Sequence, residues 1–473
     1  MFGGAVKCFD KLWLKDSLVE LYKAGCNVQD IHMMYKMNEN TVIEVETPFG
    51  TTEKITVGEV VKQGTVLGPT LCCVAIDQIN KVGEHQERSI GKEFIAILVF
   101  VDDVMSAGSP DDIRKGIRSC RKMEQLKKVT YGLKKTKYMI LNTGREEDEE
   151  INEEVNAGRV GSTDEYRYVG FELDKMGNCM HHIEQKGKEN NGHIVALKSL
   201  ASYRNVGSKF ILVRLQLYES CVIKSLLYNL EGWNKQTKKE IKKLEQQQAK
   251  ALCQIMEIPI STPYIGLLNE LGMWRVEERL AYRRIMLMQN ILKSDDRRLS
   301  KRVILDQKEE DEEDTIYRTA KDLLTKYRVN IEEIANMEKS KLKAIVKERI
   351  NEEMGRMAKE AAGKMKKLRF VDAEKFERKR YIEEMDGYEA IQTVKTRLNM
   401  LTVYGNYKAD VTLQQKCPYC NVEEDTTEHT IECRELGQSI VSRDDLRNTD
   451  NIQLWKLINE RTKFNMDNRS SRK

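Results

Sequence analysis

The sequence FIAILVFVDD, residues 94–103, joins the longest apolar run of the chain to two consecutive carboxylates. Apolar residues in such a run, between charged flanks, predict a buried strand over 94–100. Carboxylates that directly follow a strand lie at the edge of a sheet, and carboxylate oxygens suit a hard divalent cation. Asp102 and Asp103 are therefore candidate metal ligands. Taken alone, the pair is more simply explained as a turn or a helix cap, which is our interpretation of Asp111 and Asp112.

The residues around this strand follow both helical and strand periodicities. Apolar positions between Leu12 and Tyr22 recur with helical spacing, and Gly25 is a plausible end for that helix. Alternation over 41–46 predicts a strand that turns back at 48–50 towards 53–57. Further patterns predict helices over 64–82 and 110–128, strands over 137–141 and 167–173, and an acidic loop over 146–154. The first 175 residues are therefore expected to form an α+β domain.

After about residue 180 the helical period dominates and clear strand signals disappear. The acidic run at 309–314 is a candidate linker, because like charges repel one another. We expect four parts: an α+β domain over 1–175, helical domains over 176–306 and 315–412, and a short cysteine-bearing module over 413–436.

Composition limits the possible functions only weakly. The chain has 79 Lys and Arg against 75 Asp and Glu, and a net charge of +4 does not by itself indicate a nucleic-acid partner. The longest apolar run is too short to cross a membrane, and the start of the chain lacks the pattern of a signal peptide. The eleven cysteines are then expected to be reduced thiols or metal ligands of a cytoplasmic or nuclear protein.

Four motifs occur in a fixed order along the first domain: QGTVLGP at 63–69, FVDD at 100–103, YGLKKTK at 131–137 and YVG at 168–170. Together they resemble the palm of a reverse transcriptase, specifically that of the non-LTR (LINE-type) retrotransposon family. The resemblance is strong over about 5–175 and looser in the helical region, where the family has its thumb and connector. It implies an RNA template, a DNA primer or target, and dNTP substrates.

The resemblance also implies roles for individual residues. Asp102 would bind a catalytic pair of Mg²⁺ ions, and Asp103 would be a weaker or indirect partner. Gln63 and Gly64 would line the nucleotide and template pocket, and Phe9 would stack under the sugar.

Lys137 is the closest match to the family's basic residue near the triphosphate. Lys134 and Lys135 are alternatives to it.

The chain departs from the family at the first aspartate motif, which reads D-x-x-x-x-F-D. Five positions before Phe9 lies Gly4, so one metal-binding carboxylate is missing. We expect the palm strand that carries this residue, and the fingers before it, to be missing as well, which would expose a sheet edge beside Asp102. The chain would then be a truncated copy or a partial gene product without polymerase activity. Two alternatives are a catalytically dead nucleic-acid-binding remnant and a structural protein without any nucleic-acid role.

A second signal lies near the C-terminus, where Cys417, Cys420, His429 and Cys433 have the spacing C-x2-C-x8-H-x3-C. Three thiolates and one imidazole suit tetrahedral Zn²⁺. The module is too short to form a hydrophobic core, so we expect metal binding to drive its folding. Non-LTR retrotransposons often carry such a CCHC zinc knuckle after the polymerase.

Lysines also recur with helical spacing at Lys235, Lys238, Lys239, Lys242 and Lys243. They form either a solvated face balanced by glutamates or, in the position of the thumb, a surface for phosphate contacts, which position a duplex without reading its sequence.

Overall fold

The computed structural model describes residues 1–39, 41–57, 61–62, 64–82, 88–90, 93–95, 97–127, 129–141, 151–310, 313–406, 413, 415–436 and 451–460. The chain divides into two compact units, Met1–His182 and Ile183–Lys473. Helices and strands are combined in the first unit, as expected, and the second is helical. Within the described part of the chain, no helix has both the length and the apolar character needed to cross a bilayer.

A five-stranded sheet forms the centre of the first unit, in the order β13-β10-β1-β9-β8. Four of its strands are joined antiparallel, and β13 pairs parallel with β10. The strands are β1 (Phe2–Gly4), β8 (Leu98–Phe100), β9 (Asp103–Met105), β10 (Lys137–Tyr138) and β13 (Gly161–Ser162).

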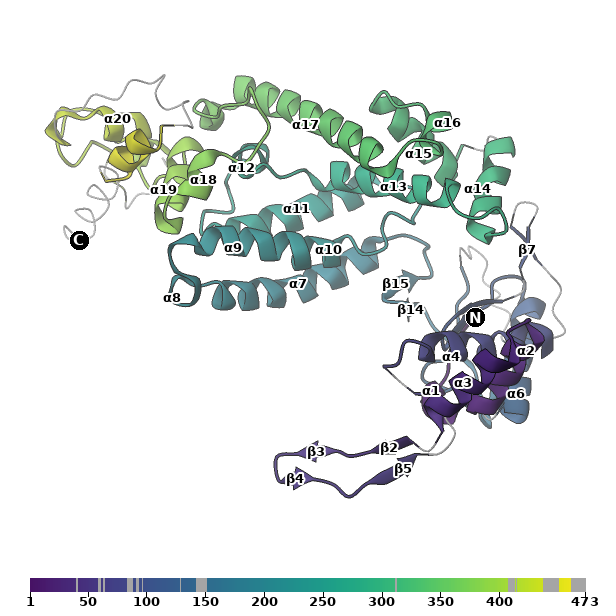
Figure 1. Cartoon of the computed structure of the whole chain (residues 1–473). Coiled ribbons are helices and arrows are strands. Elements are labelled where there is room, and N and C mark those ends of the chain that lie inside the picture. The colour runs from purple at the N-terminus through teal and green to yellow at the C-terminus, as the bar shows by residue number, and fades with distance from the viewer. Residues whose placement is uncertain are drawn as a thin grey trace. The chain divides into compact units, whose positions relative to one another are not determined.

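Helices cover this sheet and share one apolar core with it, to which Leu14, Leu71, Ile117 and Tyr131 contribute fully buried side chains. The helices are α1 (Cys8–Lys11), α2 (Leu14–Lys23), α3 (Val28–Asn38), α4 (Gly68–Ile76), α5 (Gln78–Val82) and α6 (Pro110–Lys127). Figure 1 draws α1 to α4 in purple.

Five two-stranded antiparallel sheets complete the described part of the unit. Those formed by strands β2 (Thr41–Ile43) and β5 (Ile55–Val57), and by β3 (Glu46–Thr47) and β4 (Gly50–Thr51), confirm the expected turn at 48–50. The others pair β6 (Arg88–Ile90) with β7 (Glu93–Ile95), β11 (Glu154–Val155) with β12 (Gly158–Arg159), and β14 (Glu165–Tyr168) with β15 (Phe171–Asp174).

Two sequence predictions are wrong in detail. The run 94–100 is not one buried strand, because it divides between β7 and β8, and Phe100 is 56% exposed. Its exposure follows from the position of β8, which lies at the edge of the sheet with β9 as its one partner. The stretch 167–173 is a hairpin, since Val169 and Gly170 both have positive φ and reverse the chain between β14 and β15.

The expected loss of the palm strand beside Asp102 is also contradicted. Strand β1 occupies this place and pairs with β9 on one side and β10 on the other, so the sheet has no exposed edge there. The sequence Phe-Gly-Gly has little intrinsic strand preference, and pairing on both sides holds it extended instead.

The second unit is built from helices. Its longest helix, α17, packs against α12 and α13 and appears in green in Figure 1. A single π-helical turn, Tyr218–Val222, joins α9 to α10. The helices are α7 (Met180–Leu200, which begins in the first unit), α8 (Tyr203–Val206), α9 (Phe210–Leu217), α10 (Ile223–Leu226), α11 (Lys238–Ile255), α12 (Tyr264–Leu271), α13 (Val276–Leu292), α14 (Leu299–Glu310), α15 (Ile316–Lys326), α16 (Ile331–Ile334), α17 (Lys339–Lys364), α18 (Arg380–Glu384), α19 (Gly387–Arg397) and α20 (Thr427–Glu432).

A fully buried ion pair connects α12 with α19. The Arg397 guanidinium contacts both oxygens of Glu270, at 2.8 and 3.1 Å, and the Tyr381 hydroxyl donates a hydrogen bond of 2.7 Å to the same carboxylate. Both charged side chains have no exposed surface. Because each satisfies the other, removing one partner would leave an uncompensated charge inside the unit.

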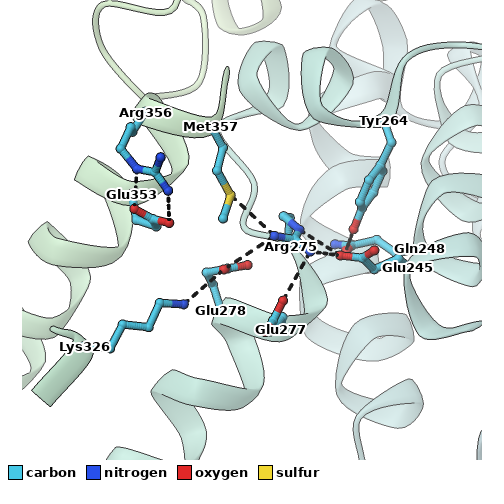
Figure 2. A network of polar contacts seen from close by, with 10 residues as sticks. All are labelled: Glu245, Gln248, Tyr264, Arg275, Glu277, Glu278, Lys326, Glu353, Arg356 and Met357. Carbon is cyan, nitrogen blue, oxygen red and sulfur yellow. Dashed lines mark hydrogen bonds and ion pairs between the residues drawn. The ribbon is translucent and has the colours of Figure 1, made fainter. Parts of the chain in front are cut away.

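A second charged network anchors the start of α13 (Figure 2). Arg275 lies 2.6 Å from Glu245 of α11, 3.2 Å from Glu277 and 3.8 Å from Glu278, and it also donates to the Met357 sulfur of α17. These contacts fix the residues around position 275 between α11 and α17.

Glu278 is the poorly satisfied member of this network. Its side chain is fully buried, and neither carboxylate oxygen has a hydrogen-bond partner among the described residues. Burial raises the pKa of this carboxyl, although Arg275 and Lys326, each 3.8 Å away, oppose the shift. The neighbouring Tyr327 hydroxyl is also buried, and no described residue forms a hydrogen bond with it.

Glu278→Gln is therefore expected to stabilise the second unit near neutral pH. A raised carboxyl pKa means that the folded state loses stability as pH rises from the ordinary value of 4.5 through the folded-state value. The gain should vanish below pH 4.5, where the carboxyl is protonated in both states. The gain is the difference in unfolding free energy between the variant and the unaltered chain. Urea unfolding, followed by circular dichroism at pH values from below 4.5 to neutral, measures it.

Glu277→Gln is the matched control, because Glu277 is adjacent, exposed and paired with the same arginine. A destabilised Glu278→Gln variant at neutral pH would contradict the prediction.

Candidate active site and metal centre

The two predicted metal ligands lie in the hairpin between β8 and β9. Phe100 pairs with Asp103, which leaves Val101 and Asp102 as a two-residue turn. Val101 has a φ of 56°, an unfavourable conformation for a β-branched residue, and such strain is often stored at functional sites. Ala5, the residue directly after β1, donates a hydrogen bond of 3.3 Å from its N–H to the Asp102 carbonyl and so attaches the turn to this segment.

Asp103 lies in a crowded polar environment. Burial raises the pKa of its carboxyl, the negative charge of Asp102 raises it further, and Lys135 opposes both effects. Two tyrosines of β14 are close enough for Asp103 to affect them: burial first, and then the Asp103 charge, raises the pKa of Tyr166 to about 12 and shifts that of Tyr168 in the same direction. A cation placed at the Asp102–Asp103 pair would relieve this repulsion.

Gly4 lies directly opposite Asp103 in the register of β1 and β9. Side chains of opposed residues in an antiparallel pair lie on the same face, with Cβ atoms about 4.5–5.5 Å apart. A carboxylate at position 4 would therefore stand beside Asp103, but glycine supplies none. A Cβ atom added there would lie 2.9 Å from the Lys135 Cβ, so the Lys135 side chain covers the place that a second carboxylate would need.

The other residues named from sequence are distributed around this site. Gly64 is exposed with a φ of +76°, and Gln63 lies outside the described residues. Phe9 is half-buried on α1 and packs against the core. Lys137 is in β10, opposite Phe2 and Gly161. Among the three candidate lysines, Lys135 is the one whose charge acts on Asp103.

The four zinc-ligand candidates come together in the second unit. The donor atoms of Cys417, Cys420, His429 and Cys433 all lie within 4.8 Å of one another. The sulfurs of Cys417 and Cys433 are 3.9 Å apart, and the Cys420 sulfur is 3.3 Å from the His429 Nε2. Tetrahedral zinc with Zn–S bonds of about 2.3 Å separates two sulfurs by about 3.8 Å, so the donor set fits Zn²⁺ in chemistry and spacing.

Local backbone structure positions these donors. Cys417 and Cys420 lie in a tight turn closed by a hydrogen bond of 2.9 Å from the Asn421 N–H to the Cys417 carbonyl. The helix α20 carries His429 and is capped at its start by Thr426 and followed by Cys433. Although burial works the other way, hydrogen bonds from the backbone around residues 422 and 423 lower the pKa of the Cys420 thiol. This favours the thiolate that a metal requires.

With both sites described, comparison with known proteins identifies the N-terminal part of the chain. Residues 5–173 match the family model for reverse transcriptase (RNA-dependent DNA polymerase). The match confirms the resemblance at this level and nearly coincides with the expected span of 5–175. No curated protein matches the chain.

The matched residues include the Asp102–Asp103 hairpin and every strand of the five-stranded sheet except β1, which ends at Gly4. The zinc-ligand cluster lies outside the match. Reverse transcriptases act on a nucleic-acid template with dNTP substrates and use divalent metal ions. Asp102 and Asp103 lie within the matched residues, and their role as metal ligands remains a prediction from the sequence.

Tyr166, which lies close enough to Asp103 to feel its charge, was not recognised as important from the sequence. Tyr166 stacks on Phe2 with ring centroids 4.3 Å apart, and its hydroxyl donates to the Lys135 carbonyl at 2.6 Å. Tyr166 is two positions before Tyr168 on the same strand, so both side chains point to one face of it. This alternation is the sequence signal that could have identified Tyr166 as a neighbour of the site.

We expect the purified chain to hold one Zn²⁺ and Cys420→Ser to release it, because the closed site needs four ligands. The 413–436 module should then lose its fold, since metal binding supplies most of its folding energy. Elemental analysis measures the metal, and proteolysis of this segment reports the fold.

Cys221→Ser is the matched control, because Cys221 is an exposed free thiol outside the cluster. An intact chain without zinc, or equal zinc loss in both variants, would contradict the assignment.

Proposed function

We propose that this chain is a reverse-transcriptase-derived protein of the non-LTR retrotransposon type that binds nucleic acid but does not polymerise. The observation that carries the proposal is the pairing of Gly4 with Asp103. The non-LTR assignment rests on the order of the four sequence motifs and on the zinc-ligand cluster that follows the helical region.

The argument against polymerisation is electrostatic. Two metal ions about 3.5–4 Å apart clamp the attacking and leaving oxygens of the transferred phosphoryl group, and carboxylates must neutralise both ions. Asp102 and Asp103 approach from the β8–β9 hairpin alone. The neighbouring strand β1 offers only Gly4 there, and the Lys135 side chain, from the turn before β10, covers that glycine and brings a positive charge that repels a second cation.

The argument for nucleic-acid binding comes from α11 and the residues just before it. Four exposed lysines recur there with helical spacing and have no carboxylate partner among the described residues: Lys235, Lys238, Lys239 and Lys242. The glutamates of the same helix are engaged elsewhere, because Glu240 caps the helix through Thr237 and Glu245 binds Arg275. The fifth lysine, Lys243, lies 3.4 Å from Glu184. This lysine face is thus left unneutralised, as phosphate binding requires.

Primer extension on an RNA template with Mg²⁺ is the test of inactivity. The chain should extend no more primer than its Asp102→Asn variant, since losing one member of a catalytic unit removes most of the rate. Gly4→Asp alone should not restore activity, because the new side chain would meet Lys135. Gly4→Ala controls for the added Cβ.

Extension by the unaltered chain that disappears in Asp102→Asn would contradict the proposal. It would mean that another acidic residue reaches the second metal ion.

Nucleic-acid binding should be largely independent of sequence and should fall steeply with salt, because bound lysines release counterions from the phosphates. Changing the four free lysines of the α11 face to glutamine should reduce the slope of log K against log salt for duplex by up to about 3.6, or about 0.9 per lost contact. Fluorescence anisotropy over a salt series gives the slope.

The matched control changes four exposed lysines of α17 to glutamine: Lys341, Lys343, Lys347 and Lys359. Affinity that is indifferent to salt, or an equal loss of slope in both variants, would show that the α11 face is not the binding surface.

A further inference from the structure

A cavity of about 410 Å³ lies on the second unit, and its lining includes none of the zinc-ligand candidates. Its volume is within the roughly 300–1,000 Å³ of small-ligand pockets. The buried side chains of Ile223 and Leu227 give it an apolar base, and two aromatic residues, Trp274 and Tyr282, form part of its wall. The remaining lining residues are charged: Glu219, Lys224, Arg279 and Arg283.

The two aromatic rings contact each other without stacking. Their centroids are 5.5 Å apart and their planes are tilted by 59°. A planar ligand would therefore lie on the face of one ring with the other ring at its edge, an arrangement that aromatic groups prefer over a parallel sandwich.

Trp274 is half-buried and held in place from several directions. Its indole N–H donates to the Asn351 side chain of α17 at 2.7 Å, and its carbonyl accepts from Gln248 of α11 and from Arg279. The next residue, Arg275, is anchored by the charged network of Figure 2. A ring held this firmly loses little conformational freedom when a ligand stacks on it.

The charges at the cavity favour an anionic ligand. Arg279 makes a two-pronged contact with Glu219 at 2.6 and 2.9 Å, and Arg283 lies 2.6 Å from Glu231. Lys224 is exposed and has no ion-pair partner among the described residues. One uncompensated cation therefore stands beside an aromatic, apolar recess.

We propose that this cavity binds an unpaired base of single-stranded nucleic acid, with the base stacked on the face of Trp274, Tyr282 at its edge and the adjacent phosphate at Lys224. Aromatic residues beside cations are how proteins hold single strands, because every base has a face on which to stack. The inference rests on the proposed nucleic-acid binding and adds a preference that phosphate contacts alone do not give: the strand must present a free base.

The test compares three probes in fluorescence anisotropy: a single-stranded oligonucleotide, an abasic strand of equal length, and a blunt duplex, in RNA and DNA forms. Trp274→Ala should weaken binding of the single strand roughly 5- to 150-fold. It should leave the abasic strand and the duplex almost unchanged, because neither offers a free base. Lys224→Ala should weaken the single strand and the abasic strand alike.

Matched variants separate stacking from other effects of the change. Trp274→Phe should retain most of the affinity because it keeps a ring, and Asn351→Ala should retain it because only the indole hydrogen bond is lost. Tyr388→Ala is the control for an exposed aromatic of the same unit that does not line this cavity, and it should have no effect. Binding of adenosine monophosphate is measured as well, to show whether a single nucleotide occupies the cavity. We expect it to bind more weakly than the single strand.

Crosslinking keeps the proposal testable if Trp274→Ala does not fold. A single strand that contains 4-thiouridine, irradiated on the unaltered chain, should attach to the peptide that holds residues 274–283. Crosslinks exclusively elsewhere, or single-strand binding unaffected by Trp274→Ala, would overturn the cavity assignment while leaving the proposed function intact. A chain that binds none of the probes would overturn both.

Discussion

Strand β1 has hydrogen-bonded neighbours on both sides, and the chemistry of the N-terminal unit depends on this pairing. Its partner β9 begins with Asp103, so the register fixes which residue of β1 faces the acidic hairpin. That residue is Gly4, and the space a side chain would need is taken by Lys135. The two strands are therefore paired at this point, while carboxylates come from the β8–β9 hairpin and not from β1.

The sequence alone was enough to predict a candidate site where its residues are close together in the chain. The Asp102–Asp103 pair lies next to a strand, as its apolar prefix indicated, and the four zinc-ligand candidates converge as their spacing required. Both cases depend on short-range geometry: a turn of two residues in one, and a turn and a helix in the other.

Long-range pairing explains most of what the sequence could not predict. Nothing in Phe2, Gly3 and Gly4 favours a strand, and the conformation comes from partners about a hundred and more than a hundred and thirty residues away. The Val169–Gly170 turn was hidden because valine rarely adopts positive φ. Which lysine lies beside Asp103 is likewise set by long-range packing. The lysine is Lys135 and not Lys137 because of how β1, β9 and the turn before β10 meet.

The π-helical turn at Tyr218–Val222 has a consequence for the helix that follows it. A π turn contains one residue more than an α turn, and each residue of a helix advances its direction by about 100°. The extra residue therefore sets the phase of α10 and of Leu227 directly after it: Ile223 and Leu227 are buried where they line the same cavity as Trp274, and Lys224 stays exposed. A chain of the same composition but one residue shorter in this turn would form a more regular helix and would turn this set of side chains away from the aromatic wall.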